Sequence, residues 1–441
     1  MTIIPGGDPG TTEPAPRPSF REAVRAWARI ALLSFGGPAG QIAVIHRVVV
    51  DEKRWVDEPR FLHALSYCML LPGPEAQQLA TYFGWFFHGT RGALVAGTLF
   101  ILPGVLAILA LSYVYVIAGN TPLVAGLFYG LKPAVLAVVL VALRRIAGRA
   151  LGGASSVAVA ALAFIALFAF QVPFPFVIGG AGILGLVLNR SADKTQNSSR
   201  SPVVRPSLTR MAGTVLLAVV IWWLPPALVL LAVGPDHALA IEARFFSKVA
   251  VVTFGGAYAV LAYVAQQAVE VYHWLTPAEM LDGLGLAEST PGPLITVLQF
   301  VGFLGAFRSP GNLEPMVAGL AGSLITTWVT FVPSFGFILA GAPWMEYFAA
   351  NRRLKAVLTG IMAAVVGVVL NLSIWFGLHT LFGETRAVEA GPLRVLWPVL
   401  ASIQWLPVAI MVLAWVTLVR FSVSLPVVLL GAAVAGILLR T

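Results

Sequence analysis

The chain has 441 residues, of which 59% are apolar and 11% are charged. Soluble globular proteins carry about 45–50% apolar and about 25% charged residues, so this composition excludes a soluble fold and indicates a membrane protein. The 28 Lys and Arg residues outnumber the 19 Asp and Glu residues, but they lie mostly in short loops between apolar segments, as topology signals do, and we exclude nucleic-acid binding.

The first 19 residues, rich in proline, glycine and threonine, are predicted to form a disordered tail. They lack the apolar core of a signal peptide, so we expect the N-terminus to be retained. A single cysteine, Cys68, excludes an internal disulfide and a cysteine-based metal site. Motifs for histidine-bound metal, for ATP and for a magnesium diphosphate are absent from the sequence. We therefore expect no cofactor, no metal and no enzymatic activity.

Apolar segments of membrane-spanning length begin at residue 30 and continue almost to the C-terminus. Residues 20–188 are predicted to form a first transporter repeat of six helices, 189–210 a basic cytoplasmic linker, 211–233 a linking transmembrane helix, and 234–441 a second repeat of six. The expected spans are 30–50, 60–87, 92–118, 122–146, 153–170 and 172–188, then 245–268, 278–305, 313–341, 354–380, 395–417 and 421–439. The predicted fold is an all-α polytopic membrane protein with thirteen crossings.

Two motifs occur twice in the same register. Phe35-Gly36-Gly37 reappears as Phe254-Gly255-Gly256, and Pro72-Gly73-Pro74 reappears as Pro291-Gly292-Pro293, each 219 residues later. An apolar composition makes coincident leucines and alanines common, but it does not produce two glycine pairs and two proline-flanked glycines at one offset. The two halves are therefore interpreted as copies of one unit.

Basic residues predict the orientation of the two copies. Cytoplasmic loops are enriched in Lys and Arg, so the N-terminal segment and the linker are assigned to the cytoplasmic side of the membrane. One further crossing by the linking helix then gives the second copy the opposite orientation. The basic residues that fall on the cytoplasmic side in this topology are Arg91, Arg144, Arg145, Arg149, Arg352, Arg353, Lys355 and Arg420. Inverted repeats are typical of alternating-access transporters.

The two Pro-Gly-Pro triplets interrupt predicted helices, because each removes two backbone donors. A new helix is expected to begin near Pro74, and its free N–H groups would lie at membrane depth, where a small oxyanion satisfies them. A simple kink and a re-entrant hairpin are the alternatives. The candidate substrate-binding residues here are Pro72, Gly73, Pro74, Gln77, Gln78, Ser289, Thr290, Pro291, Gly292 and Pro293.

The Phe-Gly-Gly segments allow two interpretations. Glycine permits either close helix packing or an unwound backbone beside a ligand. On the second interpretation the substrate-binding candidates are Phe35, Gly36, Gly37, Pro38, Phe254, Gly255 and Gly256.

Ionisable residues at membrane depth are costly and indicate function. Glu75 follows the first triplet and Glu288 precedes the second, which makes both candidate proton carriers, with helix capping as the structural alternative. Lys132 lies inside the fourth span, where it either supplies charge for an anion or extends to an interface. Asp282 is rated as a packing residue.

The motifs Phe35–Pro38 and Pro72–Pro74, with their second copies, resemble those of the long-chain, two-domain chromate ion transporter family. The resemblance extends from Phe20 to the C-terminus. It implies an inner-membrane permease that exports chromate from the cytoplasm and confers chromate resistance, with sulfate as a structurally similar oxyanion. In the second copy Ala257 stands where the first has Pro38, so the two motifs need not contribute equally.

The predicted function is export of chromate, a tetrahedral oxyanion, driven by the membrane potential or a proton gradient. A permease for sulfate or another anion is the nearest alternative, and an intramembrane lipid-modifying enzyme is a more distant one. The expected partners are the oxyanion and membrane lipid, and a homodimer is left open.

Overall fold

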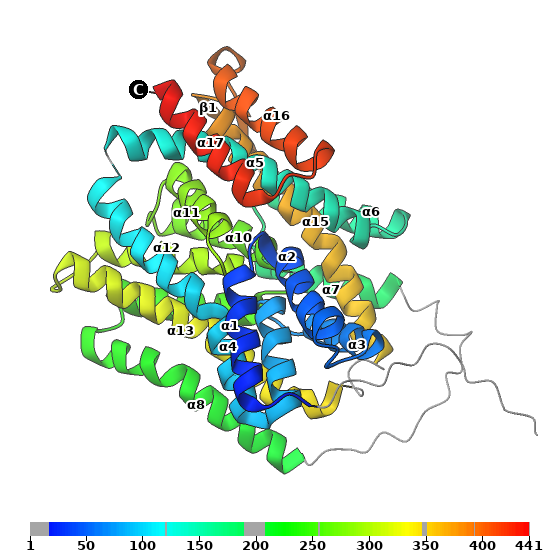
Figure 1. Ribbon diagram of the computed structural model, residues 1–441. Coiled ribbons are helices and arrows are strands. Elements are labelled where there is room, and N and C mark those ends of the chain that lie inside the picture. Colours follow the sequence, from blue (N-terminus) through cyan, green and yellow to red (C-terminus); the bar gives the residue numbers. More distant parts are fainter. Residues whose placement is uncertain are drawn as a thin grey trace, which may run out of the picture.

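The computed structural model describes residues 17–119, 121–188, 208–254, 256–345, 351–391 and 393–440. The described chain is almost entirely helical (Figure 1). Five helical segments are long and apolar enough to cross a membrane, and five shorter helices are also apolar. The predicted class, a helical polytopic membrane protein, is therefore confirmed. The predicted disordered tail and basic linker lie almost entirely outside the described residues.

The described residues of the first half form seven α-helices, and the linking helix follows them. They are α1 (Phe20–Leu33), α2 (Gly37–His46), the π-helical turn η1 (Arg47–Glu52), α3 (Glu58–Cys68), α4 (Glu75–Ala118), α5 (Pro122–Ala150), α6 (Ala154–Phe168), α7 (Phe174–Leu188) and the linking helix α8 (Leu208–Val233). Helix α4 is broken at His88 and Gly89, where the φ angle of Gly89 is +62°.

The second half begins in the same way and ends differently. Its elements are α9 (Ala238–Val252), α10 (Ala257–Gln266), η3 (Gln267–Val271), α11 (Pro277–Ser289), η4 (Leu294–Thr296), α12 (Val297–Arg308), α13 (Pro315–Gly341), η5 (Ala342–Trp344), α15 (Arg352–Leu381), β1 (Thr385–Ala390), β2 (Leu393–Pro398), η6 (Leu400–Ser402), α16 (Trp405–Arg420) and α17 (Leu425–Arg440).

A short β-hairpin interrupts the otherwise helical second half. Strands β1 and β2 pair antiparallel, with Thr385 opposite Pro398. The turn between them contains Gly391 at a φ of +60°, a left-handed conformation that ends regular structure. The predicted span 395–417 therefore starts too early, and its helix, α16, begins only at Trp405.

The prediction of six helices per half also needs correction. The segment 30–50 is two short helices, because Gly36 and Gly37 adopt φ angles of +83° and +70° and end the helical path after α1. The segment 245–268 divides in the same way before Gly256, which has a φ of +95°. Each half thus starts with short helices that cannot cross a bilayer individually at about 1.5 Å per residue.

In the first half these short helices form two hairpins. Lys53 donates to Glu22 at 2.9 Å, so the start of α1 lies beside the end of η1. The Phe20 and His88 rings are 5.3 Å apart, which brings the break in α4 to the same end. The α1–α2 hairpin and the hairpin of α3 with the front part of α4 therefore share one open end.

The second half repeats this arrangement. The Nη1 atom of Arg308, at the end of α12, donates to Glu279 near the start of α11 at 2.9 Å and to the carbonyl oxygen of Trp274 at 2.8 Å. The ring of His237, just before α9, contacts the carbonyl oxygen of Pro310 at 3.1 Å. The hairpins α9–α10 and α11–α12 thus also share an open end.

Two long helices connect these open ends. The back part of α4 leaves the break at Gly89 and reaches the second pair of hairpins, where Tyr115 donates to Asp282 at 2.9 Å. Helix α13 runs the other way, from beside Leu239 to Phe337, whose carbonyl oxygen accepts from Tyr67 of α3 at 3.4 Å. The two pairs of hairpins therefore approach one another from opposite ends of the molecule, and α2 lies beside α10 at the centre (Figure 1).

Local backbone features recur at the offset of the sequence motifs. Arg54 and His273, 219 residues apart, are two of the four described non-glycine residues with positive φ, at 52° and 54°. The amide of Trp55 donates to Val49 at 2.9 Å, and the amide of Trp274 donates to Ala268 at 2.8 Å. Agreement in such unusual conformations is a stronger sign of duplication than matching leucines.

Helix α8 lies at the edge of the fold. Only 6% of its most apolar window is buried, and most of its leucines and valines are exposed, as expected for a surface in contact with lipid. The indole of Trp222 donates to Val329 of α13 at 2.9 Å, and that of Trp328 returns to Ile221 at 3.2 Å. These bonds attach α8 to the second half.

Candidate functional site

The tips of the four hairpins meet at the centre and exchange backbone hydrogen bonds. The N–H of Gly73 donates to the carbonyl oxygen of Thr253 at 2.9 Å, and the N–H of Gly292 donates to that of Ser34 at 2.9 Å. Each Pro-Gly-Pro tip is thus held by the Phe-Gly-Gly tip of the other half. Gln41 adds a third link, because its Nε2 donates to the Gly292 carbonyl at 2.6 Å.

The geometry of the triplets explains why glycine stands between the prolines. Gly73 and Gly292 have φ angles of +118° and +113°, a region that residues with a Cβ rarely adopt. A Cβ on Gly73 would lie 2.7 Å from the hydroxyl of Ser334, and one on Gly292 would lie 3.1 Å from the Cα of Gly104. Both glycines are buried against protein, and neither lines the central cavity.

The polar residues predicted beside the triplets bind mostly to their own backbone. Ser289 donates to Leu286 at 2.9 Å, and Thr290 donates to Ala287 at 3.3 Å, so both hydroxyls satisfy the end of α11. Gln78 donates to the Pro72 carbonyl at 2.6 Å. Gln77 is fully buried, and its side-chain amide has no hydrogen-bond partner among the described residues.

A cavity of about 590 Å³ lies next to these tips. Its wall includes the first turns of α2 and α10, where the sequence motifs contribute Gly36, Gly37, Pro38 and Gly256. Gly255 lies outside the described residues. Phe35 and Phe254 are half-buried and do not line the cavity, while Glu75, at the start of α4, does.

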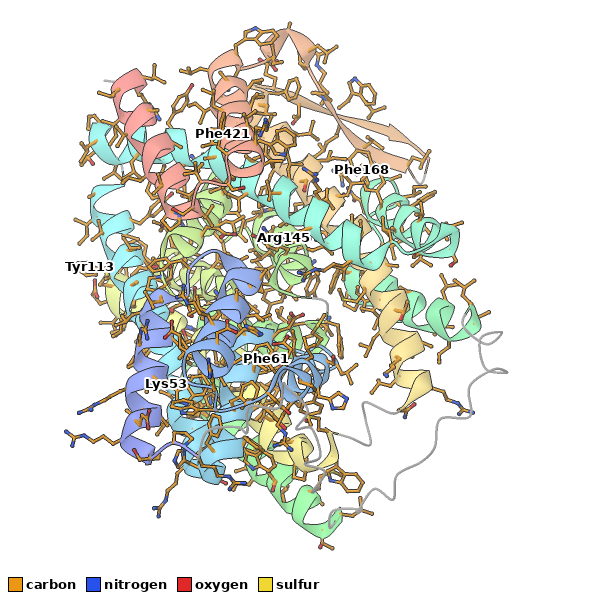
Figure 2. The ribbon with its side chains drawn as sticks, turned by 45° about the vertical axis from the view of Figure 1, so that its right-hand side comes forward. Lys53, Phe61, Tyr113, Arg145, Phe168 and Phe421 are labelled. Carbon is orange, nitrogen blue, oxygen red and sulfur yellow. The ribbon has the colours of Figure 1, made fainter. Side chains whose placement is uncertain are left out.

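Three basic side chains line the same cavity. Arg145 and Arg149 extend from the last two turns of α5, and Lys355 extends from the first turn of α15. Figure 2 shows Arg145 in the middle of the molecule. Among the described residues none of the three cations forms an ion pair. The cavity therefore carries an excess of positive charge over the single carboxylate of Glu75.

Helix N-termini add to this positive potential. Helix α2 is preceded by Gly36 and α10 by Gly256, and neither glycine supplies a side-chain acceptor to the free N–H groups of the first turn. Pro74 likewise leaves the first turn of α4 without a side-chain cap. Uncapped N–H groups and the positive end of the helix dipole favour an anion. The backbone N–H groups and the basic side chains thus both favour an anion in this cavity.

The two carboxylates singled out in the sequence lie in different surroundings. Glu75 lines the cavity directly. Glu288 is 1% exposed and accepts a hydrogen bond from the hydroxyl of Tyr258, a residue that lines the cavity from α10. The second carboxylate oxygen of Glu288 has no partner in the described part of the chain. Tyr258 therefore connects Glu288 to the cavity.

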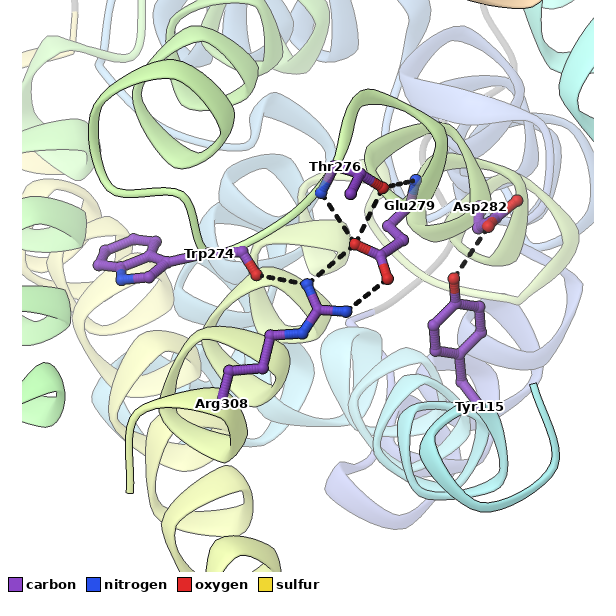
Figure 3. Close-up of polar contacts among 6 residues, drawn as sticks. All are labelled: Tyr115, Trp274, Thr276, Glu279, Asp282 and Arg308. Atoms are coloured by element: carbon purple, nitrogen blue, oxygen red, sulfur yellow. Dashed lines mark hydrogen bonds and ion pairs between the residues drawn. The ribbon is translucent and has the colours of Figure 1, made fainter. Parts of the chain in front are cut away.

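Lys132 does not line this cavity. Its Nζ lies 3.4 Å from one carboxylate oxygen of Asp282. The other oxygen of Asp282 accepts a hydrogen bond from the hydroxyl of Tyr115 at 2.9 Å, as Figure 3 shows. The Lys132 ammonium group is thus paired with a carboxylate inside the fold. This geometry does not support the prediction that Lys132 supplies positive charge for an anion. Asp282 is the ion-pair partner of Lys132, although the sequence predicts only a packing role for Asp282.

From the sequence, Arg145, Arg149 and Lys355 are predicted only to mark the cytoplasmic side of the membrane. The available signal was spacing, since Arg145 and Arg149 lie four residues apart and so share one face of a helix. That face could not be assigned to a cavity without the packing of α15 against α5.

Comparison with known proteins agrees with the motifs. The family model described as chromate transporter matches residues 21–186 and 242–437. A chromate transport protein of Pseudomonas aeruginosa is 33% identical over 367 residues, covering 81% of this chain and 82% of that protein. A chromate transport protein of Cupriavidus metallidurans is 26% identical, covering 82% of this chain and 83% of the relative.

A shorter relative matches only part of the chain. An uncharacterised transporter of Bacillus subtilis is 26% identical over 157 residues, which are 88% of that protein but 35% of this chain. No solved structure matches the chain significantly. With the family model matching most of both halves, the chain belongs to the chromate transporter family.

Proposed function

We propose that this protein exports chromate from the cytoplasm across the inner membrane, and that the central cavity is its oxyanion site. The observation that carries the proposal is a set of three cations, Arg145, Arg149 and Lys355, which form no ion pair within the described residues and lie beside the uncapped first turns of α2 and α10. A tetrahedral dianion satisfies several N–H donors and two positive charges at once. The names of the relatives support chromate as the substrate.

The transport cycle we propose is alternating access by two inverted repeats. Support comes from the recurrence of local geometry 219 residues apart, and from hairpins that approach the centre from opposite ends. The relative of about two fifths of this length is consistent with a unit that was duplicated. In such a cycle the Pro-Gly-Pro tips act as junctions between the halves, and the Phe-Gly-Gly turns contact the substrate.

We propose that the cavity described here opens toward the cytoplasm. Arg145, Arg149 and Lys355 surround it, and basic residues mark the cytoplasmic side in membrane proteins. The N-terminus then also lies in the cytoplasm. An inside-negative potential drives a dianion outward with about 2.3 kcal/mol per charge per 100 mV. Glu75 and Glu288, by exchanging protons with the cavity, are the candidates for coupling to a proton gradient.

The test is uptake of labelled chromate into everted membrane vesicles, which measures export. We expect Arg145→Gln, Arg149→Gln and Lys355→Gln each to raise the half-saturating chromate concentration about tenfold or more, because each removes a charge-assisted contact. Arg144→Gln and Arg353→Gln are matched controls, since both residues are exposed neighbours that do not line the cavity. Equal effects at lining and control positions would refute the assignment of the site.

The same assay separates the alternative functions. A permease for sulfate or another anion would take up that anion with unlabelled chromate as a poor competitor. A lipid-modifying enzyme would give vesicles without chromate uptake. Whether the protein acts as a homodimer stays a prediction, tested by the mass of the purified protein in detergent.

A further inference from the structure

Helix α13 carries a stripe of polar side chains that faces the interior of the protein. Ser323, Thr326, Thr330 and Ser334 are three or four residues apart, so they lie on one face of the helix. All four are between 0% and 3% exposed. At about 1.5 Å per residue the stripe extends for roughly 16 Å, a large part of the thickness of a bilayer core.

The hydroxyls of this stripe lack the partners that buried hydroxyls normally have. A serine or threonine inside a helix usually donates to the carbonyl four residues earlier, as Thr327 does to Ser323 at 2.8 Å. The hydroxyls of Thr326, Thr330 and Ser334 have no hydrogen-bond partner among the described residues. Ser323 accepts from the Nε2 of Gln299 at 3.0 Å, and the Oε1 of Gln299 is again unpartnered.

One end of the stripe reaches the hairpin tip beside the cavity. A Cβ added to Gly73 would lie 2.7 Å from the Ser334 hydroxyl and 2.8 Å from the Nε2 of Gln78, so both groups lie beside Gly73. Gln77, next along α4, contributes a fully buried and unpartnered amide. Glu75 lies two residues before Gln77 and lines the cavity.

The other end reaches a buried carboxylate on α9, Glu242. This side chain is 0% exposed, and its Oε2 lies 2.7 Å from the place of a Cβ on Gly322, next to Ser323. Its Oε1 lies 2.6 Å from the place of a Cβ on Gly305, against the ring of Trp274. The backbone amide of Ala306 is beside it, but within the described residues neither carboxylate oxygen has a hydrogen bond of standard geometry.

The charges around Glu242 give it no counter-ion. In the described part of the chain it forms no ion pair with α12, α13 or the Trp274 loop. The nearby cation Arg308 donates to the Trp274 carbonyl and is already paired with Glu279 (Figure 3). An isolated buried carboxylate is very costly in a medium of low polarity, so such a group binds a proton when nothing else neutralises it.

We propose that Glu242 is a proton-binding site, and that the α13 stripe is the proton path between Glu242 and the cavity. Hydroxyls four residues apart on a helix are about 6 Å apart, a gap that one hydrogen-bonded water bridges. A proton taken up by the Glu242 carboxylate passes from oxygen to oxygen along Thr326, Thr330 and Ser334 toward Gln78 and Glu75. The inference rests on the proposed transport function and adds to it a second proton site, far from the oxyanion site.

The experiment uses the full chain in proteoliposomes, with a pH-sensitive dye inside and the membrane potential clamped. At alkaline pH, where chromate is a dianion, one imposed pH unit should change chromate accumulation about tenfold for each coupled proton. In Glu242→Gln we expect the pH gradient to lose this effect, while chromate exchange without a gradient continues. Thr330→Val should slow dye-reported proton movement at least tenfold. Thr327→Val is the matched control, because its hydroxyl already binds its own helix.

The outcomes distinguish the two proposals. If the unaltered protein exchanges no chromate, the proposed transport function fails. If it exchanges chromate and responds to the pH gradient, but Glu242→Gln and Thr330→Val respond in the same way, transport stands and the proton site at Glu242 is refuted. If Thr327→Val matches Thr330→Val, the stripe is not the path. Chromate exchange at the unaltered rate in Glu242→Gln shows that this variant is folded.

Discussion

The backbone N–H of Gly73 donates to the carbonyl oxygen of Thr253 at 2.9 Å, and the two residues belong to different halves of the chain. The equivalent bond, from Gly292 to Ser34, has the same length and runs in the opposite sense. Because both bonds use main-chain atoms, the contact does not depend on the side chains that differ between the halves. Any movement of one half against the other must either preserve these two bonds or break at least one of them.

The glycine at each tip should therefore resist substitution. We expect Gly73→Ala to lower the free energy of unfolding by about 1–3 kcal/mol, because alanine is strained at a φ of +118° and its methyl group would meet Ser334 and Gln78. Gly292→Ala should behave similarly, with Gly104 as the group in contact. Thermal unfolding of the purified protein in detergent measures both.

Gly148→Ala is the control for these variants. Gly148 lies in α5, and no described atom beyond the neighbouring backbone of its own helix lies within 4 Å of the place of its Cβ. Alanine there should be neutral or stabilising by up to about 1 kcal/mol, since alanine is the better helix former. If all three variants unfold at one temperature, the tips do not constrain the fold as their geometry indicates.

The hydrogen bond from Tyr258 to Glu288 should contribute to stability as well as to the cavity. Tyr258→Phe leaves a carboxylate that is 1% exposed without its one described donor, which costs about 1–3 kcal/mol. Glu288→Gln retains an acceptor for the hydroxyl and should cost less. Tyr263→Phe, on the same helix, is the control, because Tyr263 packs by its ring against Phe174. A Tyr258→Phe variant as stable as this control would exclude a structural hydrogen bond to Glu288.

The sequence predicts the hairpin tips well because they depend on local backbone chemistry. Glycine between two prolines cannot continue a helix, so the break at Pro72–Pro74 follows from residue types alone. The positions of the two triplets in one register also follow from the sequence. What the sequence does not provide is the partner of each tip, since the bond from Gly73 to Thr253 joins residues 180 positions apart.

The cavity and the buried charges are harder to predict, because they too depend on contacts between residues far apart in the sequence. Arg145 occurs in a basic cluster at a helix end, and such clusters are common at the cytoplasmic surface of any membrane protein. Only the packing of α15 and the hairpin tips against α5 makes it part of a cavity. Lys132 is a similar case, because its partner Asp282 lies 150 positions away and the 219-residue offset pairs Asp282 with His63 instead.

The contact between Arg308 and Glu279 should depend on the shape of the guanidinium group. Arg308 donates to both oxygens of Glu279 and to the carbonyl of Trp274 (Figure 3), a geometry that lysine cannot reproduce. We expect Arg308→Lys to destabilise the protein by about 1 kcal/mol, a modest value because the arginine is 39% exposed. Thermal unfolding in detergent measures this, with the exposed Arg353→Lys as the control. Equal unfolding temperatures would mean that a simple positive charge is sufficient at this position.

The Lys132–Asp282 pair predicts how much stability is lost when a buried charge loses its partner. Lys132→Met leaves Asp282, whose side chain is 5% exposed, with only the Tyr115 hydroxyl as a partner, and we expect a loss of about 1–3 kcal/mol. Asp282→Asn should be similarly costly, because it leaves the ammonium group of Lys132 without its carboxylate. The double variant removes both charges, so it should recover most of the stability lost in either single one. Thermal unfolding of the four proteins forms a double-mutant cycle. Simple additivity of the two losses would mean that the pair does not interact, and chromate binding abolished in the double variant would return Lys132 to the substrate path.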